Sequence, residues 1–102
     1  MELPIACTLT EVQLQERRRT VLDSVGSAIE SVEPLPEGYQ YTFAPDAGIL
    51  MLLSHLVSLE SQCCRFLTFK IVVEAGGGPI ILEVTGPPGA KELIAEFLGG
   101  PR

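Results

Sequence analysis

The longest helical pattern of apolar positions in the chain lies between Ile49 and Phe69. Apolar side chains recur there at the spacing of one helix face, while serines and Gln62 occupy the opposite face. The pattern predicts a buried amphipathic helix from about Ala47 to Cys64, and Asp46 has the residue type of an N-cap. The remaining segments are expected to pack around this central helix.

Glu60 breaks the pattern of the central helix. Its angular position falls near the middle of the apolar face, and Cys63 and Cys64 follow at i+3 and i+4 on the same face. A lone ionised carboxylate on a buried face is strongly unfavourable unless it is paired or protonated. We therefore expect Glu60 to be mostly buried and to contact an arginine, a backbone donor or a thiol.

Alternation with a period of two predicts four strands that form two hairpins. The first hairpin combines residues 28–32 and 39–43 around a turn at 34–38, and the second combines 67–74 and 80–85 around the AGGGP turn at 75–79. Each hairpin has one apolar face, which must be covered by another layer.

Two further helices flank these hairpins. Capping boxes at Thr8 or Thr10 start the first helix, Gly26 ends it, and the last helix covers about Lys91–Leu98. The order of elements is therefore α-ββ-α-ββ-α. It predicts an α+β fold with two layers, in which a four-stranded, mainly antiparallel sheet carries three helices on one face.

The apolar positions of the strands predict which side of the sheet is covered. The residues expected to face the helices are Tyr39, Tyr41, Phe43, Phe69, Ile71, Leu82 and Val84. The opposite face should be mostly polar, with Val72 and Ile81 as apolar interruptions. These two residues leave room for a homodimer or a partner protein, and the sequence leaves the oligomeric state open.

Composition limits the classes of protein to which the chain belongs. Its 102 residues are 46% apolar, which indicates a single domain over residues 1–102. The segment Met1–Ala6 lacks the features of a signal peptide, and no apolar run reaches the roughly 18 residues that span a bilayer. A cytoplasmic protein with no membrane partner is expected. The net charge of −6 repels phosphate backbones, which disfavours nucleic-acid binding by this chain alone.

The three cysteines, Cys7, Cys63 and Cys64, are the residues that suggest chemistry. Adjacent Cα atoms lie about 3.8 Å apart, below the usual minimum of about 4.4 Å for a disulfide, so a vicinal bridge is disfavoured. Three free thiols are expected in a reducing compartment. Thiolates are ligands that zinc and heavier thiophilic ions prefer, and Glu60 can add an oxygen ligand.

The metal hypothesis places Cys7 beside the vicinal pair, because the first helix begins directly after Cys7 and its cap can pack on the end of the central helix. Adjacent cysteines in a helix diverge by about 100°, so both reach one ion only where the helix unwinds. Zinc or another thiophilic metal ion, bound by Cys7, Cys63, Cys64 and Glu60, is the expected cofactor. Its affinity should fall as the pH drops, because thiols coordinate as thiolates.

Two other interpretations stay open. The cysteines can be small buried residues or redox-sensing thiols of a non-catalytic interaction or regulatory module. The partner of Glu60 can be Arg17, Arg18, Arg19 or Arg65. His55 projects to the polar side of the central helix and is expected at the surface. Enzymatic activity is the least supported class, since no set of catalytic or cofactor-binding residues is found.

Three segments resemble a largely uncharacterised family of small bacterial domains. The resemblance is carried by ACTLT at 6–10, ESQCCRFLTF at 60–69 and GGGPIILEVTGPPGAKELI at 76–94. Members of that family occur alone and are sometimes appended to MerR-type metal-responsive regulators. The recurring patterns C-T-L and E-x-x-C-C-x-F-x-x-F map onto Cys7, Glu60, Cys63, Cys64, Phe66 and Phe69. The resemblance favours the metal hypothesis and implies no particular enzymatic activity.

Overall fold

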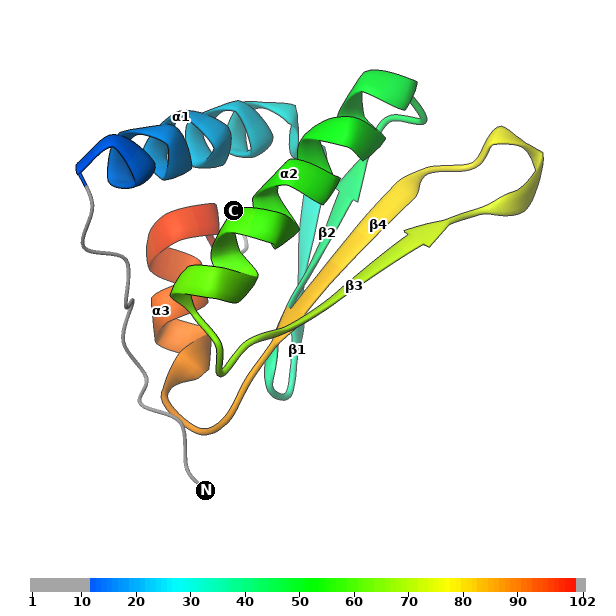
Figure 1. The fold of residues 1–102 in the computed structure, drawn as a ribbon. Coiled ribbons are helices and arrows are strands. Elements are labelled where there is room, and N and C mark those ends of the chain that lie inside the picture. Colours follow the sequence, from blue (N-terminus) through cyan, green and yellow to red (C-terminus); the bar gives the residue numbers. More distant parts are fainter. Residues whose placement is uncertain (1–11, 101–102) are drawn as a thin grey trace.

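The computed structural model describes residues 12–100 and has the expected α+β architecture. Three helices lie on one face of a four-stranded antiparallel sheet, as Figure 1 shows. The elements in chain order are α1 (Val12–Ala28), β1 (Ser31–Leu35), β2 (Gly38–Phe43), α2 (Ala47–Cys63), β3 (Thr68–Val73), the short 3₁₀ helix η1 (Ala75–Gly77), β4 (Ile80–Thr85) and α3 (Ala90–Leu98). The predicted order of helices and strands is confirmed.

The strand order is β1-β2-β4-β3, and every neighbouring pair is antiparallel. β4, the last strand in the chain, therefore lies between β2 and β3. Its residue Leu82 pairs with Tyr41 of β2 on one side and with Ile71 of β3 on the other. Because residues directly opposite each other point to the same face of a sheet, these three side chains form one row beneath the helices.

The helices form a layer in which α2 contacts β3, and α3 contacts β2 and β4. α1 packs on α2 and α3. This packing brings Arg18 of α1 next to Glu60, near the end of α2. The predicted start of the first helix, at Thr8 or Thr10, lies outside the described residues. No helix within residues 12–100 is long and apolar enough to cross a membrane.

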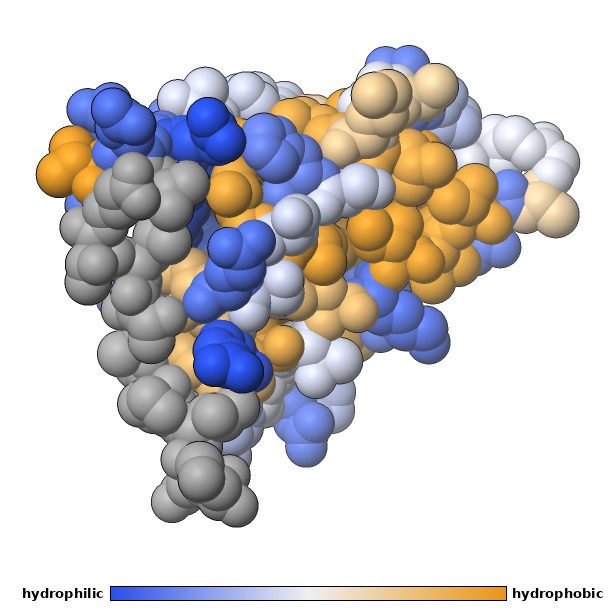
Figure 2. Space-filling view, viewed as in Figure 1, coloured by the Kyte–Doolittle hydropathy of each residue, from blue (hydrophilic) through white to orange (hydrophobic). Residues whose placement is uncertain are grey.

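The predicted apolar face of the sheet is confirmed. Tyr39, Tyr41, Phe43, Leu82 and Val84 are buried, and Phe69 and Ile71 are partly buried against the core. Figure 2 shows apolar residues gathered over α2 and the β3–β4 hairpin. The large apolar side chains that are exposed are Val12, Met51 and Val73, whereas Val72 and Ile81 are partly buried.

α2 forms as the apolar periodicity predicts. The Oδ1 atom of Asp46 accepts a hydrogen bond from the backbone N–H of Gly48 at 3.1 Å, which caps the first turn. The buried residues of α2 are Leu53, Leu56, Leu59, Glu60 and Cys63. The apolar face of the helix therefore carries one carboxylate and one cysteine into the core.

The first hairpin is displaced from its predicted position. α1 continues through Gly26 to Ala28, and β1 begins at Ser31. A glycine inside a helix costs about 1 kcal/mol relative to alanine, and the packing of α1 on the other two helices offsets that cost. The backbone N–H of Glu30 donates to the Thr42 carbonyl at 2.8 Å, so pairing with β2 decides where β1 starts.

Pro34 lies inside β1, whereas the sequence pattern placed it in the turn. The turn consists of Pro36 and Glu37, which connect the paired residues Leu35 and Gly38. β1 is an edge strand, and a proline is tolerated there because one side of the strand needs no backbone donor.

Candidate metal centre

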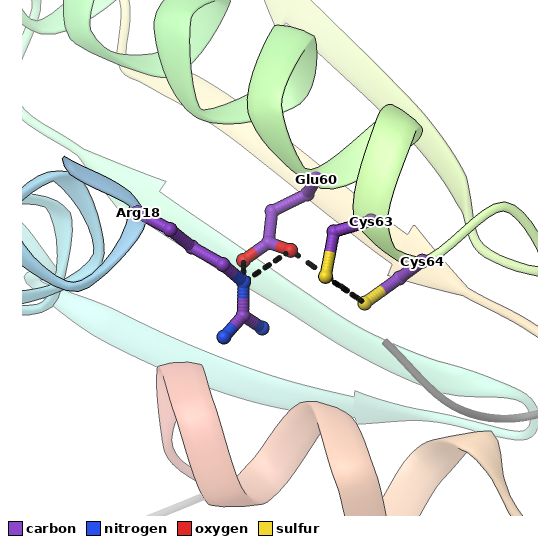
Figure 3. A network of polar contacts seen from close by, with 4 residues as sticks. All are labelled: Arg18, Glu60, Cys63 and Cys64. Carbon is purple, nitrogen blue, oxygen red and sulfur yellow. Dashed lines mark hydrogen bonds and ion pairs between the residues drawn. The ribbon is translucent and has the colours of Figure 1, made fainter. Parts of the chain in front are cut away.

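The end of α2 presents three buried side chains to one point of the core. Glu60 and Cys63 belong to the buried face of the last turns, and Cys64 is the C-cap. All three residues are 0% exposed. Figure 3 shows the carboxylate of Glu60 and the two sulfur atoms on the same side of α2, facing Arg18 of α1. The predicted convergence of a carboxylate and two sulfurs is thus present.

Cys64 leaves the helical conformation, which allows the two sulfurs to approach each other. Its dihedral angles are φ −119° and ψ 73°, while its backbone N–H still donates to the Glu60 carbonyl at 2.6 Å. The Sγ atoms of Cys63 and Cys64 lie 3.7 Å apart. The local unwinding that a shared site for adjacent cysteines requires is therefore built into the end of α2.

Arg18 is the arginine that neutralises Glu60. Its Nε–H donates to Oε2 at 2.9 Å, and Nε lies 2.8 Å from Oε1. The terminal guanidinium nitrogens point away from Glu60, toward α3 (Figure 3). There the guanidinium carbon lies 5.2 Å from the centre of the Phe97 ring, which is the range of a cation–π contact. The expectation that Glu60 is buried and contacts an arginine is confirmed.

The two oxygens of Glu60 are not equally satisfied. Nε–H of Arg18 is directed at Oε2, so its contact with Oε1 is an ion-pair contact without hydrogen-bond geometry. Among the described residues, Oε1 has no hydrogen-bond partner. Leaving a buried acceptor unsatisfied costs about 1–3 kcal/mol. The site therefore contains a buried oxygen with unused capacity to bind a donor or a cation.

Cys64 is a protonated thiol at neutral pH. Burial raises the pKa of the Cys64 thiol to about 11, and the negative charge of Glu60 raises it further than the positive charge of Arg18 lowers it. The Sγ atom donates to Oε2 of Glu60 at 3.6 Å. A metal ion that binds this sulfur must displace the proton that now lies between the thiol and the carboxylate.

The two cysteines of the pair are in different states. Cys63 is disulfide-bonded, and Cys64 is a free, buried thiol. Because Cys64 is free, the bond does not join the vicinal pair, in agreement with the short Cα separation of adjacent residues. The expectation of free thiols throughout is wrong for Cys63. Disulfide formation depends on the three-dimensional approach of two cysteines, which spacing along the chain does not report.

Three of the four predicted ligands form one cluster. Glu60, Cys63 and Cys64 each offer a ligand atom, and these atoms lie within 4.8 Å of one another. Cys7, the fourth predicted ligand, lies outside the described residues, so its place beside the pair stays a prediction. His55 is exposed on the outer face of α2, as expected, and does not belong to the cluster.

Phe97 is the residue of this site that the sequence pattern does not identify. Its spacing with Leu93 and Ile94 marks it as an inward position of the last helix, which is also true of ordinary core residues. Its role as a platform for Arg18 depends on the packing of α1 against α3. No signal within the last helix reports that contact.

Comparison with known proteins assigns no family and no function to this site. No family model, no curated protein and no solved structure matches the chain.

Proposed function

We propose that the reduced protein binds one soft metal or metalloid ion at the end of α2, through Cys63, Cys64 and Glu60. The observation that carries the proposal is the grouping of three buried ligand atoms within 4.8 Å, one of them from a carboxylate with an oxygen that lacks a hydrogen bond. Sulfur ligands select zinc, copper(I) and heavier thiophilic ions over magnesium or calcium. Cys7 is the expected additional ligand.

The unequal hydrogen bonding of the two Glu60 oxygens supports binding of an ion over a purely structural role for Glu60. A structural carboxylate gains most when both of its oxygens are hydrogen-bonded. Here one guanidinium N–H and one thiol both donate to Oε2. A divalent ion that replaces two thiol protons of the reduced protein leaves the net charge of the cluster unchanged, so Arg18 still balances the carboxylate.

The test is native mass spectrometry of the freshly reduced protein, titrated separately with zinc, mercury(II) and arsenite. We expect uptake of one ion, with loss of the thiol protons. Cys63→Ser and Cys64→Ser should each weaken binding at least about tenfold, because each removes a thiolate from the ligand set. Cys7→Ser tests the predicted third thiolate in the same assay.

Ser61→Ala is the matched control for these variants. Ser61 lies in the same turn of α2 but is exposed on its outer face, so its replacement should leave binding unchanged. If the wild-type protein takes up none of the three ions at micromolar concentration, or if a variant without cysteines binds equally well, the proposal is wrong.

A second candidate is a redox-responsive regulatory module, and it is favoured by the disulfide-bonded state of Cys63 next to a free thiol. In that case the protein should change its oxidation state without binding an ion. Mass spectrometry of the alkylated protein after glutathione treatment measures that state. The resemblance to domains appended to MerR-type regulators supports a regulatory role in either case.

A further inference from the structure

We infer that the outer edge of β3 pairs with the same edge of a second copy of this chain, so that two four-stranded sheets become one. β3 lies at one edge of the sheet, in the strand order β1-β2-β4-β3, as Figure 1 shows. Within residues 12–100, β4 is the only strand that pairs with β3. The backbone N–H and C=O groups on the outer side of β3 are therefore available to a further strand.

The two edges of the sheet differ in their capacity to pair. β1, at the opposite edge, contains Pro34, which lacks a backbone donor, and the exposed charged residue Glu33. β3 has the sequence TFKIVV and contains no proline. Its residues Ile71, Val72 and Val73 are β-branched, a type that favours strand pairing, and Val73 is 58% exposed. β3 is therefore the edge that is open to association.

Symmetry and charge select one register for the contact between the two copies. In a twofold-symmetric antiparallel pair, the strands cross at one residue that lies opposite itself, because opposite residues are either both hydrogen-bonded or both not. A crossing at Lys70 would place two lysines opposite each other, which is unfavourable. A crossing at Val72 places Lys70 opposite Glu74 of the second copy, and Glu74 is extended, with φ −72° and ψ 145°. A crossing at either neighbour of Val72 leaves Lys70 without an acidic residue opposite it.

The crossing at Val72 also joins the apolar rows of the two sheets. On the helix side, Ile71 pairs with Leu82 of β4 and lies opposite Val73 of the second copy. On the open side, Val72 pairs with Ile81 of β4 and lies opposite Val72 of the second copy. Figure 2 shows that the β3–β4 hairpin carries apolar residues at this end of the sheet. The dimer therefore covers Val73, one of the exposed apolar side chains of the single chain.

Lys70 lies between two carboxylates in this arrangement. Within the chain, its Nζ atom is 3.9 Å from Oε2 of Glu83 on β4, and its side chain is 69% exposed. An exposed lysine on an edge strand disfavours pairing with a strand that presents no negative charge opposite it. Glu74 of the second copy supplies that charge on the other side of Lys70. Lys70 therefore makes the edge selective for a second copy of this chain.

Sedimentation equilibrium of the wild-type protein measures the dimer directly. We expect a monomer–dimer equilibrium with a dissociation constant between about 1 and about 100 µM, because the interface is small. Hydrogen–deuterium exchange of the backbone amides of residues 70–74 should be slower at high than at low protein concentration, with no such change in β1. A protein that stays monomeric at about 100 µM, or concentration-dependent protection only outside residues 70–74, overturns the inference.

Charge reversal tests the register. Lys70→Glu and Glu74→Lys should each raise the dissociation constant at least about tenfold, because the symmetry of the dimer places like charges opposite each other twice. An equimolar mixture of the two variants should dimerise again, since each altered pair then combines opposite charges. Glu33→Lys is the control, because it makes the same charge change as Glu74→Lys on the other edge of the sheet and should leave the dimer intact.

Circular dichroism verifies that each variant keeps its fold. Dimers that persist unchanged in both single variants, or a mixture that stays monomeric, overturn the inference. Loss of the dimer in Glu33→Lys has the same consequence, since it assigns the contact to β1. Should a variant fail to fold, the hydrogen–deuterium exchange of the wild-type protein decides.

Discussion

Nε of Arg18 lies 2.8 Å from Oε1 and 2.9 Å from Oε2 of Glu60, whose side chain is fully buried at the end of α2. The pair joins α1 to α2 across 42 positions of the sequence. Arg18 itself is 21% exposed and therefore stays partly hydrated. The Glu60 carboxylate is fully buried and would lose its counter-ion if Arg18 were replaced. The contribution of Arg18 to the free energy of unfolding can therefore be measured by substitution.

Arg18→Met should destabilise the protein strongly. The substitution keeps most of the apolar stem but leaves the Glu60 carboxylate without its counter-ion, and breaking a buried pair in this way costs about 3–5 kcal/mol. We expect a value near 3 kcal/mol in urea denaturation, because Arg18 is partly exposed. Arg19→Met is the control, since Arg19 is exposed and its replacement should change stability by less than about 0.5 kcal/mol.

The double variant Arg18→Met, Glu60→Met should recover most of the stability that Arg18→Met loses. It removes both charges at once, and apolar replacements of a buried pair are often neutral or stabilising. Equal stability of the two single arginine variants, or a double variant no more stable than Arg18→Met, contradicts the role assigned to the pair.

The reactivity of Cys64 should depend on Glu60. At neutral pH the thiol is protonated and buried, since its pKa is raised to about 11 by burial and then by the carboxylate. Iodoacetamide should therefore modify Cys64 slowly in the folded protein and faster as the pH rises toward 11, as measured by peptide mass spectrometry. Glu60→Gln should lower this pKa and accelerate the reaction at pH 8, whereas Ser61→Ala should not. Identical rates in wild type and Glu60→Gln are the contrary result.

Tyr41 should make the protein less stable at alkaline pH. Its hydroxyl donates to the Gly99 carbonyl at 2.8 Å, and burial, followed by the neighbouring Tyr39, raises its pKa well above the usual value. Above about pH 10 the unfolded chain releases the Tyr41 proton while the folded chain keeps it. The contribution of Tyr41 to the free energy of unfolding is thus fully present below about pH 10. It is lost as the pH rises from there toward the pKa of Tyr41 in the folded protein.

Urea denaturation of wild type and Tyr41→Phe from pH 8 to 11 checks this dependence. Below pH 10 the variant should be less stable by about 1 kcal/mol, because it lacks one buried hydrogen bond. Above pH 10 the difference should shrink. Tyr39→Phe should keep the alkaline loss of stability, because Tyr41 is unchanged. A constant difference between wild type and Tyr41→Phe over the whole range rules out the assigned titration.

Ion uptake should depend on reduction of Cys63. A sulfur in a disulfide cannot act as a thiolate ligand, and Cys63 is disulfide-bonded in this structure. We therefore expect the protein purified without reductant to take up no zinc, and treatment with a reductant to restore one site. Native mass spectrometry before and after reduction measures this directly. Equal uptake in both states means that Cys63 is not a ligand.

The helices and most of the strands follow from the sequence alone, because the spacing of apolar residues is a local property. The apolar periodicity around Leu53 and Leu56 predicts α2, and alternation through Tyr39 and Tyr41 predicts β2 and its buried face. The same local reasoning misplaces β1, since Gly26 resembles a helix end. The backbone pairing of Glu30 with Thr42, a tertiary contact, places the strand.

For the candidate site, the spacing along the chain was enough to predict that Glu60, Cys63 and Cys64 lie on one face at the end of α2, because residues three and four apart in a helix are neighbours. The packing of α1 against α2 selects Arg18, and not Arg17, Arg19 or Arg65, as the residue that balances the carboxylate. The tertiary structure also places Phe97 against Arg18, and Cys64 unwinds to bring its sulfur to that of Cys63. These contacts join α1, α2 and α3, and their geometry depends on how whole helices pack, which no local pattern along the chain specifies.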